Sequence, residues 1–287
     1  MKDIDLSIKY QLEALAVAST PLESAKRAEF LNNLGISYNI RCNRFGDIKD
    51  INSSIKRLLE AVSSTPLDKP EHLIYQSNLG NAYADRFKRS RDVKDIDLAI
   101  KEQLEAVTSI AIDSRDRSRL LHHLGVSYLE RFGHSRDVKD LDLAIQRQLE
   151  ASASIRSTIR PGFYSYILGI LYICRFGFSR EVKDIDFAIE KLVEATATTP
   201  PDCADQPLFL YSLGHLYFFR KNQPTDLEES ISKFRLSSLS LKGLPSLRIM
   251  ASLYWPCLAH KGNNLVSAFE AYDQAFSSFT SSRLDRT

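Results

Sequence analysis

The sequence lacks an excess of charge of either sign. Its 287 residues include 38 Lys and Arg against 36 Asp and Glu, which leaves a formal net charge of +2. A protein that binds nucleic acid or an anionic membrane through phosphate groups needs a basic surface. We therefore expect neither nucleic acid nor membrane as a partner.

Long apolar runs are missing as well. The longest run, residues 166–174, is far shorter than the ~20 residues that a membrane-spanning helix requires, and it ends at Arg175. The N-terminus, Met1 to Asp5, has no apolar stretch of the kind found in signal peptides. The sequence thus predicts a cytoplasmic protein, with a nuclear location as the open alternative.

Cysteine is scarce. Cys42, Cys174, Cys203 and Cys257 show no CxxC spacing and have no histidine at a ligand's distance along the chain. Disulfide frameworks and zinc sites depend on such spacings. We therefore predict reduced, mostly buried thiols, with no role in metal binding or in disulfides.

Catalytic motifs are absent from the sequence. It contains no Gly-rich phosphate loop, no HExxH, no GxSxG and no paired carboxylates outside the repeated positions described below. A cysteine protease would need an exposed, electropositive nucleophile, and none of the cysteines has the required local pattern. We expect no enzymatic activity and no cofactor.

What the sequence does contain is a phrase repeated five times: Leu-Gly, a Tyr three residues after the Gly, and an Arg three residues after that. The glycines are Gly35, Gly80, Gly125, Gly169 and Gly214, so successive copies are 45, 45, 44 and 45 residues apart. The tyrosines and arginines of the phrase are Tyr38, Tyr83, Tyr128, Tyr172 and Tyr217, and Arg41, Arg86, Arg131, Arg175 and Arg220. A constant spacing of this kind is typical of a fold built by stacking one structural unit.

A second phrase lies between the glycines and begins with aspartate. Its copies are residues 3–14, 50–61, 95–106, 140–151, 184–195 and, more weakly, 226–237. Apolar residues recur at helical spacing in each copy, as in Ile100, Leu104 and Val107. The leading Asp of each copy is a predicted N-cap, because a carboxylate accepts hydrogen bonds from the free N–H groups of a first helical turn.

Together the two phrases predict an all-α fold, a right-handed α-solenoid of stacked antiparallel helix pairs with a period of about 45 residues. We expect one domain over residues 1–287. Its predicted parts are an unpaired leading helix (1–20), five helix pairs (24–66, 69–111, 114–156, 159–200 and 204–240), a degenerate closing pair (243–280) and a flexible tail (281–287).

Residues common to all units are expected to serve packing. A helical glycine costs about 1 kcal/mol relative to alanine, so its recurrence predicts close approach of the two helices of a unit. The Tyr should fill the gap between units. The Arg is expected to cap the first helix or to pair across helices, and so is the glutamate that recurs in the second phrase. These glutamates are Glu13, Glu60, Glu105, Glu150 and Glu194.

These residues resemble the tetratricopeptide repeat (TPR). The full TPR pattern is matched by Gly169, Tyr172, Ala188, Ala195 and Pro200, and other units match it with one position changed or missing. The period is longer than in the usual repeat. Such long units, with an Asp-Ile-Asp-x-Ala-Ile phrase, look like the TPR tracts of basidiomycete fungi that often precede a caspase-like CHAT protease domain.

The TPR resemblance implies a non-catalytic scaffold or adaptor that binds a protein or peptide in its concave groove. The alternative is the regulatory sensor part of a fungal CHAT-type protease system whose catalytic domain is absent from this chain. Self-association through the unpaired leading helix is a further possibility, with light scattering as its test.

The predicted groove uses positions that vary between units, on the first helix of each pair. These residues are Asn32, Asn33, Asn39, Ser77, Asn78, Asn81, His122, Tyr166, Tyr211, His215 and Phe218. The N-terminal half is rich in amides, which offer a donor and an acceptor to a peptide backbone. The C-terminal half is aromatic and suited to apolar side chains. Asn33, Asn78 and Asn81 resemble the amides of the TPR carboxylate clamp, but its basic residues are missing. His122 and His123 are adjacent on a helix, which disfavours a shared metal ion.

Overall fold

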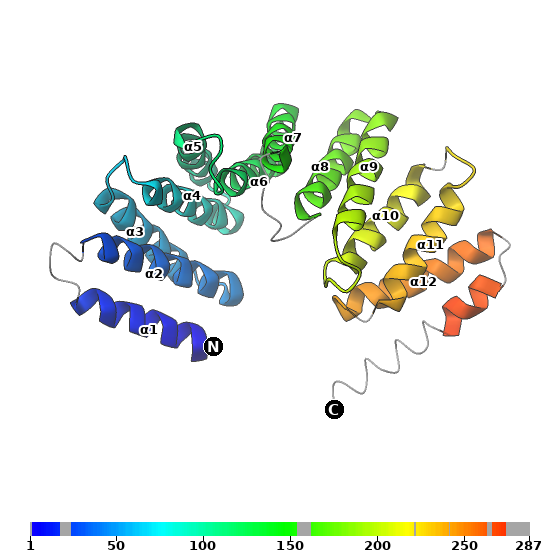
Figure 1. Cartoon of the computed structure of the whole chain (residues 1–287), viewed down its shortest axis with the longest axis horizontal. Coiled ribbons are helices and arrows are strands. Elements are labelled where there is room, and N and C mark those ends of the chain that lie inside the picture. Colours follow the sequence, from blue (N-terminus) through cyan, green and yellow to red (C-terminus); the bar gives the residue numbers. More distant parts are fainter. Residues whose placement is uncertain are drawn as a thin grey trace. The chain divides into compact units, whose positions relative to one another are not determined.

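The computed structural model describes residues 2–17, 24–153, 162–220, 222–240, 242–262 and 266–273. The chain divides into two compact units, Met1–Arg156 (unit 1) and Ser157–Thr287 (unit 2), and each is described separately. In both units the described residues form helices joined by short connections (Figure 1). The expected all-α fold is confirmed.

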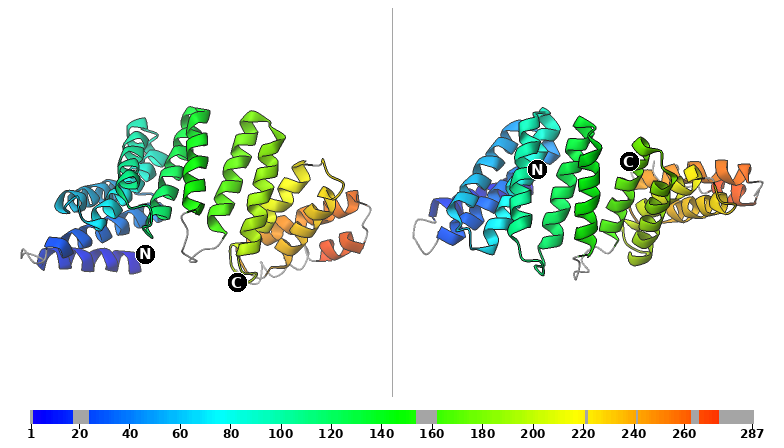
Figure 2. Two further views of the ribbon diagram at one scale, coloured as in Figure 1. Left: turned by 45° about the horizontal axis from the view of Figure 1, so that its top comes forward. Right: turned by 90° about the horizontal axis from the view of Figure 1, so that it is seen from above.

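Unit 1 contains seven of the described helices. They are α1 (Lys2–Val17), α2 (Ser24–Phe45), α3 (Ile48–Ser64), α4 (Pro70–Ser90), α5 (Val93–Ser109), α6 (Arg117–Ser135) and α7 (Val138–Ala153). The pairs α2/α3, α4/α5 and α6/α7 pack most closely, and the second helix of each pair also packs against the first helix of the next pair. Figure 2 shows these helices side by side in sequence order.

Unit 2 continues the same alternation. Its described helices are α8 (Phe163–Ser179), α9 (Val182–Thr198), α10 (Gln206–Arg220), α11 (Asp226–Leu239) and α12 (Pro245–Lys261), and residues 266–273 are also helical. We call α2, α4, α6, α8, α10 and α12 the first helices. The others are the second helices. The predicted tail (281–287) lies outside the described residues.

The recurring glycine lies where the two helices of a pair approach each other. A Cβ atom on Gly80 would lie 3.0 Å from the backbone oxygen of Ala99 and 2.6 Å from Cγ of Gln103. On Gly35 it would lie 3.2 Å from the backbone oxygen of Ser54. The backbone neighbour cannot rotate away as a flexible side chain can, so the close approach predicted from the sequence is confirmed.

The leading Asp of the second phrase is not the N-cap, which corrects the sequence-based prediction. Helix α5 begins at Val93, two residues before Asp95. Asp92 caps this helix by accepting a hydrogen bond from the Lys94 N–H at 3.1 Å. Asp95 instead lies in the first turn, 4% exposed. The same shift occurs in α3, where Asp47 is the cap and Asp50 is buried. The capping side chain must reach the free N–H groups at the start of the helix. Asp95, the third residue of α5, faces the neighbouring helix instead.

Each buried Asp pairs with the Arg of the preceding helix. Arg86 donates from Nε (2.8 Å) and Nη2 (2.6 Å) to the two carboxylate oxygens of Asp95. A bidentate pair of this kind fixes both distance and orientation. Equivalent pairs are Arg41 with Asp50, Arg131 with Asp140, Arg175 with Asp184 and Arg220 with Asp226. The recurring Arg therefore pairs across the two helices of its unit.

The same guanidinium also joins adjacent pairs and covers the recurring Tyr. Nη1 of Arg131 donates to Asp97 on the preceding second helix at 3.0 Å. Its guanidinium carbon lies 5.6 Å from the centre of the Tyr128 ring, within range of a cation–π interaction. Tyr128 itself is 6% exposed. The Tyr-x-x-Arg phrase is thus a joint between helices, and both Tyr128 and Arg131 are occupied by packing contacts.

Substitution Asp92→Ala tests the corrected cap. It should lower the free energy of unfolding by about 1 kcal/mol, the usual loss for removing a side-chain cap, as measured by urea denaturation followed by circular dichroism. Asp113→Ala is the matched control, because Asp113 is exposed in a turn of the same unit and should change stability by less than about 0.5 kcal/mol. An equal effect of the two substitutions would contradict the assignment of Asp92 as the cap.

Candidate interaction surface

All the predicted groove residues lie on first helices. Those from Asn32 to His122 lie on α2, α4 and α6 of unit 1, and those from Tyr166 to Phe218 lie on α8 and α10 of unit 2. The structure links the unit 1 residues through hydrogen bonds and most of the unit 2 residues through ring contacts, so that each unit carries its own candidate surface.

A chain of three amides links α2 and α4. Nδ2 of Asn78 donates to Oδ1 of Asn32 at 2.9 Å, and Nδ2 of Asn32 donates to Oδ1 of Asn33 at 3.3 Å. Asn32 is 6% exposed, whereas Asn33 and Asn78 are half-buried. Within the described part of the chain, Nδ2 of Asn33 and Oδ1 of Asn78 have no hydrogen-bond partner. The two ends of the amide chain therefore offer one donor and one acceptor to a ligand.

A second polar cluster in unit 1 centres on His123, which the sequence analysis had not selected. Nδ1 of His123 lies 3.0 Å from Nδ2 of Asn81 and 3.1 Å from Oγ of Ser77. Gln103 donates to Oδ1 of Asn81 at 2.8 Å, which orients the Asn81 amide group toward the histidine. This arrangement makes Nδ1 of His123 an acceptor and assigns its proton to Nε2.

Burial keeps His123 neutral. Desolvation, together with the neighbouring His122 and Arg119, lowers the pKa of His123 to about 3, and the more distant Asp85 only partly opposes this. Burial also lowers the pKa of His122, whose Nδ1 lies 3.0 Å from Oε1 of Gln148. Both rings are therefore uncharged at neutral pH.

Two buried glutamines complete this cluster and were also missed. Gln103 and Gln148 are each 1% exposed, at the repeat position that Leu58 and Leu192 occupy in other units. A polar residue at a position that is otherwise apolar was the signal in the sequence that could have found them. Oε1 of Gln103 and Nε2 of Gln148 have no hydrogen-bond partner in the described structure. This part of unit 1 therefore contains one buried acceptor and one buried donor that are not used within the chain.

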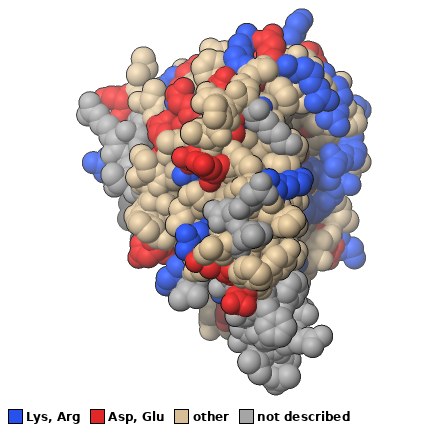
Figure 3. All heavy atoms as spheres, turned by 90° about the vertical axis from the view of Figure 1, so that its right-hand side faces the viewer, with Lys and Arg blue, Asp and Glu red and all other residues tan. Residues whose placement is uncertain are grey.

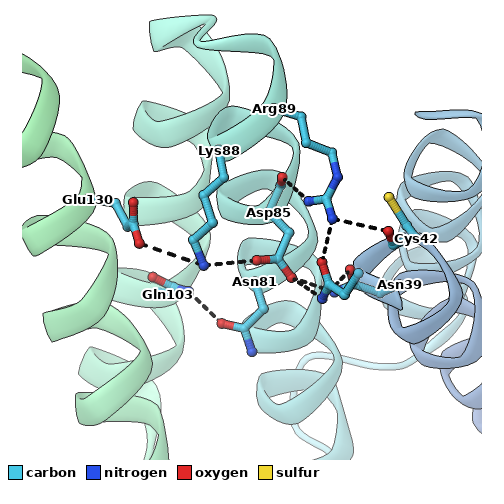
Figure 4. Close-up of polar contacts among 9 residues, drawn as sticks. Asn39, Cys42, Asn81, Asp85, Lys88, Arg89, Gln103 and Glu130 are labelled. Atoms are coloured by element: carbon cyan, nitrogen blue, oxygen red, sulfur yellow. Dashed lines mark hydrogen bonds and ion pairs between the residues drawn. The ribbon is translucent and has the colours of Figure 1, made fainter. Parts of the chain in front are cut away.

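Asp85 holds a third polar cluster at the other end of α4 (Figure 4). Its carboxylate accepts hydrogen bonds from Nδ2 of Asn39 at 3.0 Å and of Asn43 at 3.1 Å, and from Nζ of Lys88 at 3.0 Å. Burial by itself would raise the pKa of Asp85, but Lys88 and the two amides outweigh it and the pKa is lowered. Asp85 thus remains charged and ties α2 to α4.

Arg89 closes the same cluster on the side of α2. Its Nη2 donates to the backbone oxygen of Cys42 at 3.1 Å and to Oδ1 of Asn43 at 2.9 Å. On the other side, Nζ of Lys88 lies 3.7 Å from a carboxylate oxygen of Glu130 on α6. The amide of Asn39, predicted to face a ligand, is therefore used between repeats.

The candidate surface of unit 2 is an aromatic cluster around His215. The centre of the His215 ring lies 4.6 Å from that of Tyr211, 5.0 Å from that of Phe234 and 4.5 Å from that of Tyr254. Burial alone lowers the pKa of His215. Tyr254 is a residue that the sequence analysis assigned to a degenerate pair and did not place in the groove.

Two predicted residues of unit 2 lie at the margins of this cluster. Tyr166 stacks on Phe209 with ring centres 4.6 Å apart. Phe218 packs against the buried core around Trp255 and contacts the ammonium group of Lys261 at 5.8 Å. A pocket of about 260 Å³ beside Phe218 is lined by Tyr217, Leu227 and Lys261 among others.

The described surface contains neither a metal cluster nor a membrane-spanning helix. No group of three or more His, Cys, Asp or Glu side chains converges within the described ranges. None of the helices described is both long and apolar enough to cross a membrane. Uncharged side chains cover much of the face drawn in Figure 3, with acidic and basic groups around them.

The cysteines differ from the prediction in their exposure. All four are free thiols, but Cys42 is buried, Cys174 and Cys203 are half-buried, and Cys257 is exposed. Burial raises the pKa of Cys42. Cys257 follows Pro256 on α12.

Comparison with known proteins agrees with this architecture. No protein-family model matches the chain, and no curated protein sequence matches it. Among solved structures, the C-terminal part of a TPR repeat-containing protein from Cytophaga hutchinsonii is 17% identical, with a TM-score of 0.57 over 96% of this chain and 94% of that one. A putative kinesin light chain from Podospora anserina with nearly identical TPR-like repeats is 14% identical, with a TM-score of 0.51 over 74% of this chain and 95% of that one.

The chain has the fold of a TPR solenoid, in which recurring residues hold the helices together. Some variable residues of the first helices, such as Asn32 and Asn39, are also used in packing, whereas Asn33 and Asn78 are half-exposed. The likeness to these solved structures is one of fold.

Proposed function

We propose that the first-helix surfaces of the two units bind a segment of a protein partner, and that the chain is a non-catalytic scaffold or adaptor in the cytoplasm. The observation that carries this proposal is that recurring and variable residues of the first helices are used differently. The recurring Gly, Tyr and Arg are used in packing, whereas Asn33, Asn78 and the rings around His215 keep free hydrogen-bonding groups or exposed aromatic surface.

An affinity capture from cell lysate followed by mass spectrometry tests the proposal. The double variant Asn33→Ala with Asn78→Ala, and separately Tyr211→Ala, should each reduce recovery of at least one partner by about tenfold, as expected for loss of a contact worth ~1.4 kcal/mol. Lys101→Ala is the control, because Lys101 is exposed on a second helix. If both variants retain every partner at the wild-type level, the surfaces have been assigned wrongly.

We also propose a regulatory role in a fungal CHAT-type protease system. Its support is the long repeat period and the Asp-Ile-Asp-x-Ala-Ile phrase, which resemble the TPR tracts that precede such proteases. Sequencing the genomic region beyond the codon for Thr287 tests the proposal. A continuing reading frame with a His and Cys signature, or a neighbouring gene that encodes one, would support it, and the absence of both would refute it.

Self-association is a third candidate function that one observation favours. Helix α1 packs against α2, and Leu6, Tyr10 and Leu12 are 44%, 63% and 40% exposed within the described structure. A second copy could cover these side chains. Light scattering should then show a dimer that Tyr10→Ser dissociates. A monomer at high concentration would exclude this mode of association.

A further inference from the structure

Helix α12 presents a partly exposed apolar stripe. Met250, Leu253 and Tyr254 are 43%, 50% and 41% exposed. Residues three and four apart lie on one side of a helix, so the three side chains form a continuous strip. Trp255 and Leu258, which are 1% and 3% exposed, belong to the buried core of this unit. Tyr254 also stacks on Phe234, with ring centres 5.3 Å apart, so the stripe borders the core and is only partly free of contacts.

This stripe is continuous with the aromatic cluster on α10. The ring of Tyr254 contacts those of His215, at 4.5 Å, and Tyr211, at 6.2 Å. Phe219 stacks on the other side of His215 at 6.3 Å and is 66% exposed. We call the combined surface the α10–α12 face, made of Tyr211, His215, Phe219, Met250, Leu253 and Tyr254. An exposed apolar surface of this extent is typical of a protein-binding site.

The α10–α12 face has no carboxylate of its own. The sequence contains no Asp or Glu in residues 206–225 or in residues 236–269. Rings of Tyr211, Phe219, Phe234 and Tyr254 contact His215, and burial, with no contribution from an acidic group, lowers its pKa. In contrast, first helices of unit 1 carry Asp85 and Glu130.

A cation without an acidic partner stands at one end of this face. Lys261 is exposed at the end of α12, next to His260, and its ammonium group lies 5.8 Å from the Phe218 ring. It forms no ion pair within the described structure. An exposed ammonium group beside an apolar surface attracts a carboxylate and repels a second cation.

We propose that the α10–α12 face binds a partner segment in which aromatic or aliphatic side chains are flanked by Asp or Glu. The apolar side chains pack on Phe219, Leu253 and Tyr254, and a carboxylate pairs with Lys261. A lysine-rich segment of the same hydrophobicity finds no acidic group on this face and binds less well. This inference rests on the proposed scaffold function and specifies the chemistry of the partner for unit 2.

Panning a random peptide library against the full chain tests the inference without knowledge of the natural partner. Phage displaying peptides of about twelve residues would be selected on wild-type protein, and the binding of enriched peptides measured by fluorescence polarisation. The expected peptides contain an aromatic residue and an excess of Asp and Glu. The double variant Phe219→Ser with Leu253→Ser should weaken their binding by about tenfold, and Lys261→Glu should weaken it by about threefold or more.

Controls separate this inference from the scaffold function. Phe269→Ser removes an aromatic side chain that is 74% exposed in the same unit but outside the face, and it should leave binding unchanged. Circular dichroism would verify that each variant is folded. Neutral or basic peptides, or acidic peptides insensitive to the Phe219 and Leu253 changes, would overturn the inference while leaving the scaffold function intact.

Two further outcomes would show that the α10–α12 face does not bind an acidic segment. If the wild-type chain forms a dimer that the Phe219 and Leu253 changes dissociate, and no acidic peptide is enriched, the occupant is a second copy and the inference is wrong. If no peptide is enriched, while wild-type protein captures partners from lysate independently of Phe219 and Leu253, the scaffold function stands and the inference fails. Failure of the lysate capture as well would refute both.

Discussion

Replacing Arg131 by methionine is expected to lower the free energy of unfolding of unit 1 by about 3 kcal/mol, because it leaves the Asp140 carboxylate buried without its partner. The Asp140 side chain is 7% exposed, and that of Arg131 is 28% exposed. Two hydrogen bonds of 2.9 and 2.6 Å join them, and a third bond from Arg131 reaches Asp97. Urea denaturation followed by circular dichroism would measure the loss.

Two further variants make this prediction specific. In the double variant Arg131→Met with Asp140→Leu no charge is left buried, so most of the lost stability should return. Lys9→Met is the control for an exposed pair, since Lys9 and Glu13 are 67% and 59% exposed, and it should cost less than about 1 kcal/mol. If Arg131→Met costs no more than Lys9→Met, the pair does not stabilise the helix stack.

Lowering the pH from 7 to 5 is expected to destabilise unit 1 by about 2 kcal/mol through His123 alone. The pKa of this histidine is about 3 in the folded chain, because of desolvation and of the nearby His122 and Arg119, and about 6.5 when the chain is unfolded. Between these two values the unfolded chain binds more protons than the folded chain. Stability is therefore fully present above pH 6.5 and decreases as the pH falls toward 3.

Variant His123→Gln isolates this effect. Glutamine cannot be protonated in this range, so its unfolding midpoint in urea should change much less between pH 7 and pH 5 than that of the wild type. His134→Gln, at an exposed position of the same helix, should keep the wild-type pH response. A pH response of the His123 variant as steep as that of the wild type would show that the histidine does not control acid stability.

The recurring residues could be interpreted from the sequence because each performs the same task in every copy. Gly80 must lack a side chain because the Ala99 backbone lies so near, and the same contact recurs at Gly35. Helical periodicity likewise identified the paired helices. The prediction of the N-cap residue was wrong because either Asp92 or Asp95 could cap the helix by its local sequence. Only the ion pair with Arg86 shows that Asp95 is the buried one of the two.

The candidate surface was less predictable from the sequence. Its location on the first helices followed from the variability of the positions, but the contacts there depend on side chains from other units. Nothing local in the sequence indicates that Asn39 bonds to Asp85, 46 residues away, or that Gln103 orients Asn81 toward His123. Tyr254 was overlooked because its helix departs from the repeated phrase.

The sequence by itself determined that this protein is a stack of helix pairs, because a fixed spacing of Gly, Tyr and Arg specifies one local packing solution repeated along the chain. Only the tertiary structure decided which variable side chains are used between helices and which remain available. Hydrogen bonds and ring contacts such as those of Asn32 and His215 form between residues distant in sequence. Their pairing depends on the close stacking of the helices, which no single repeat contains.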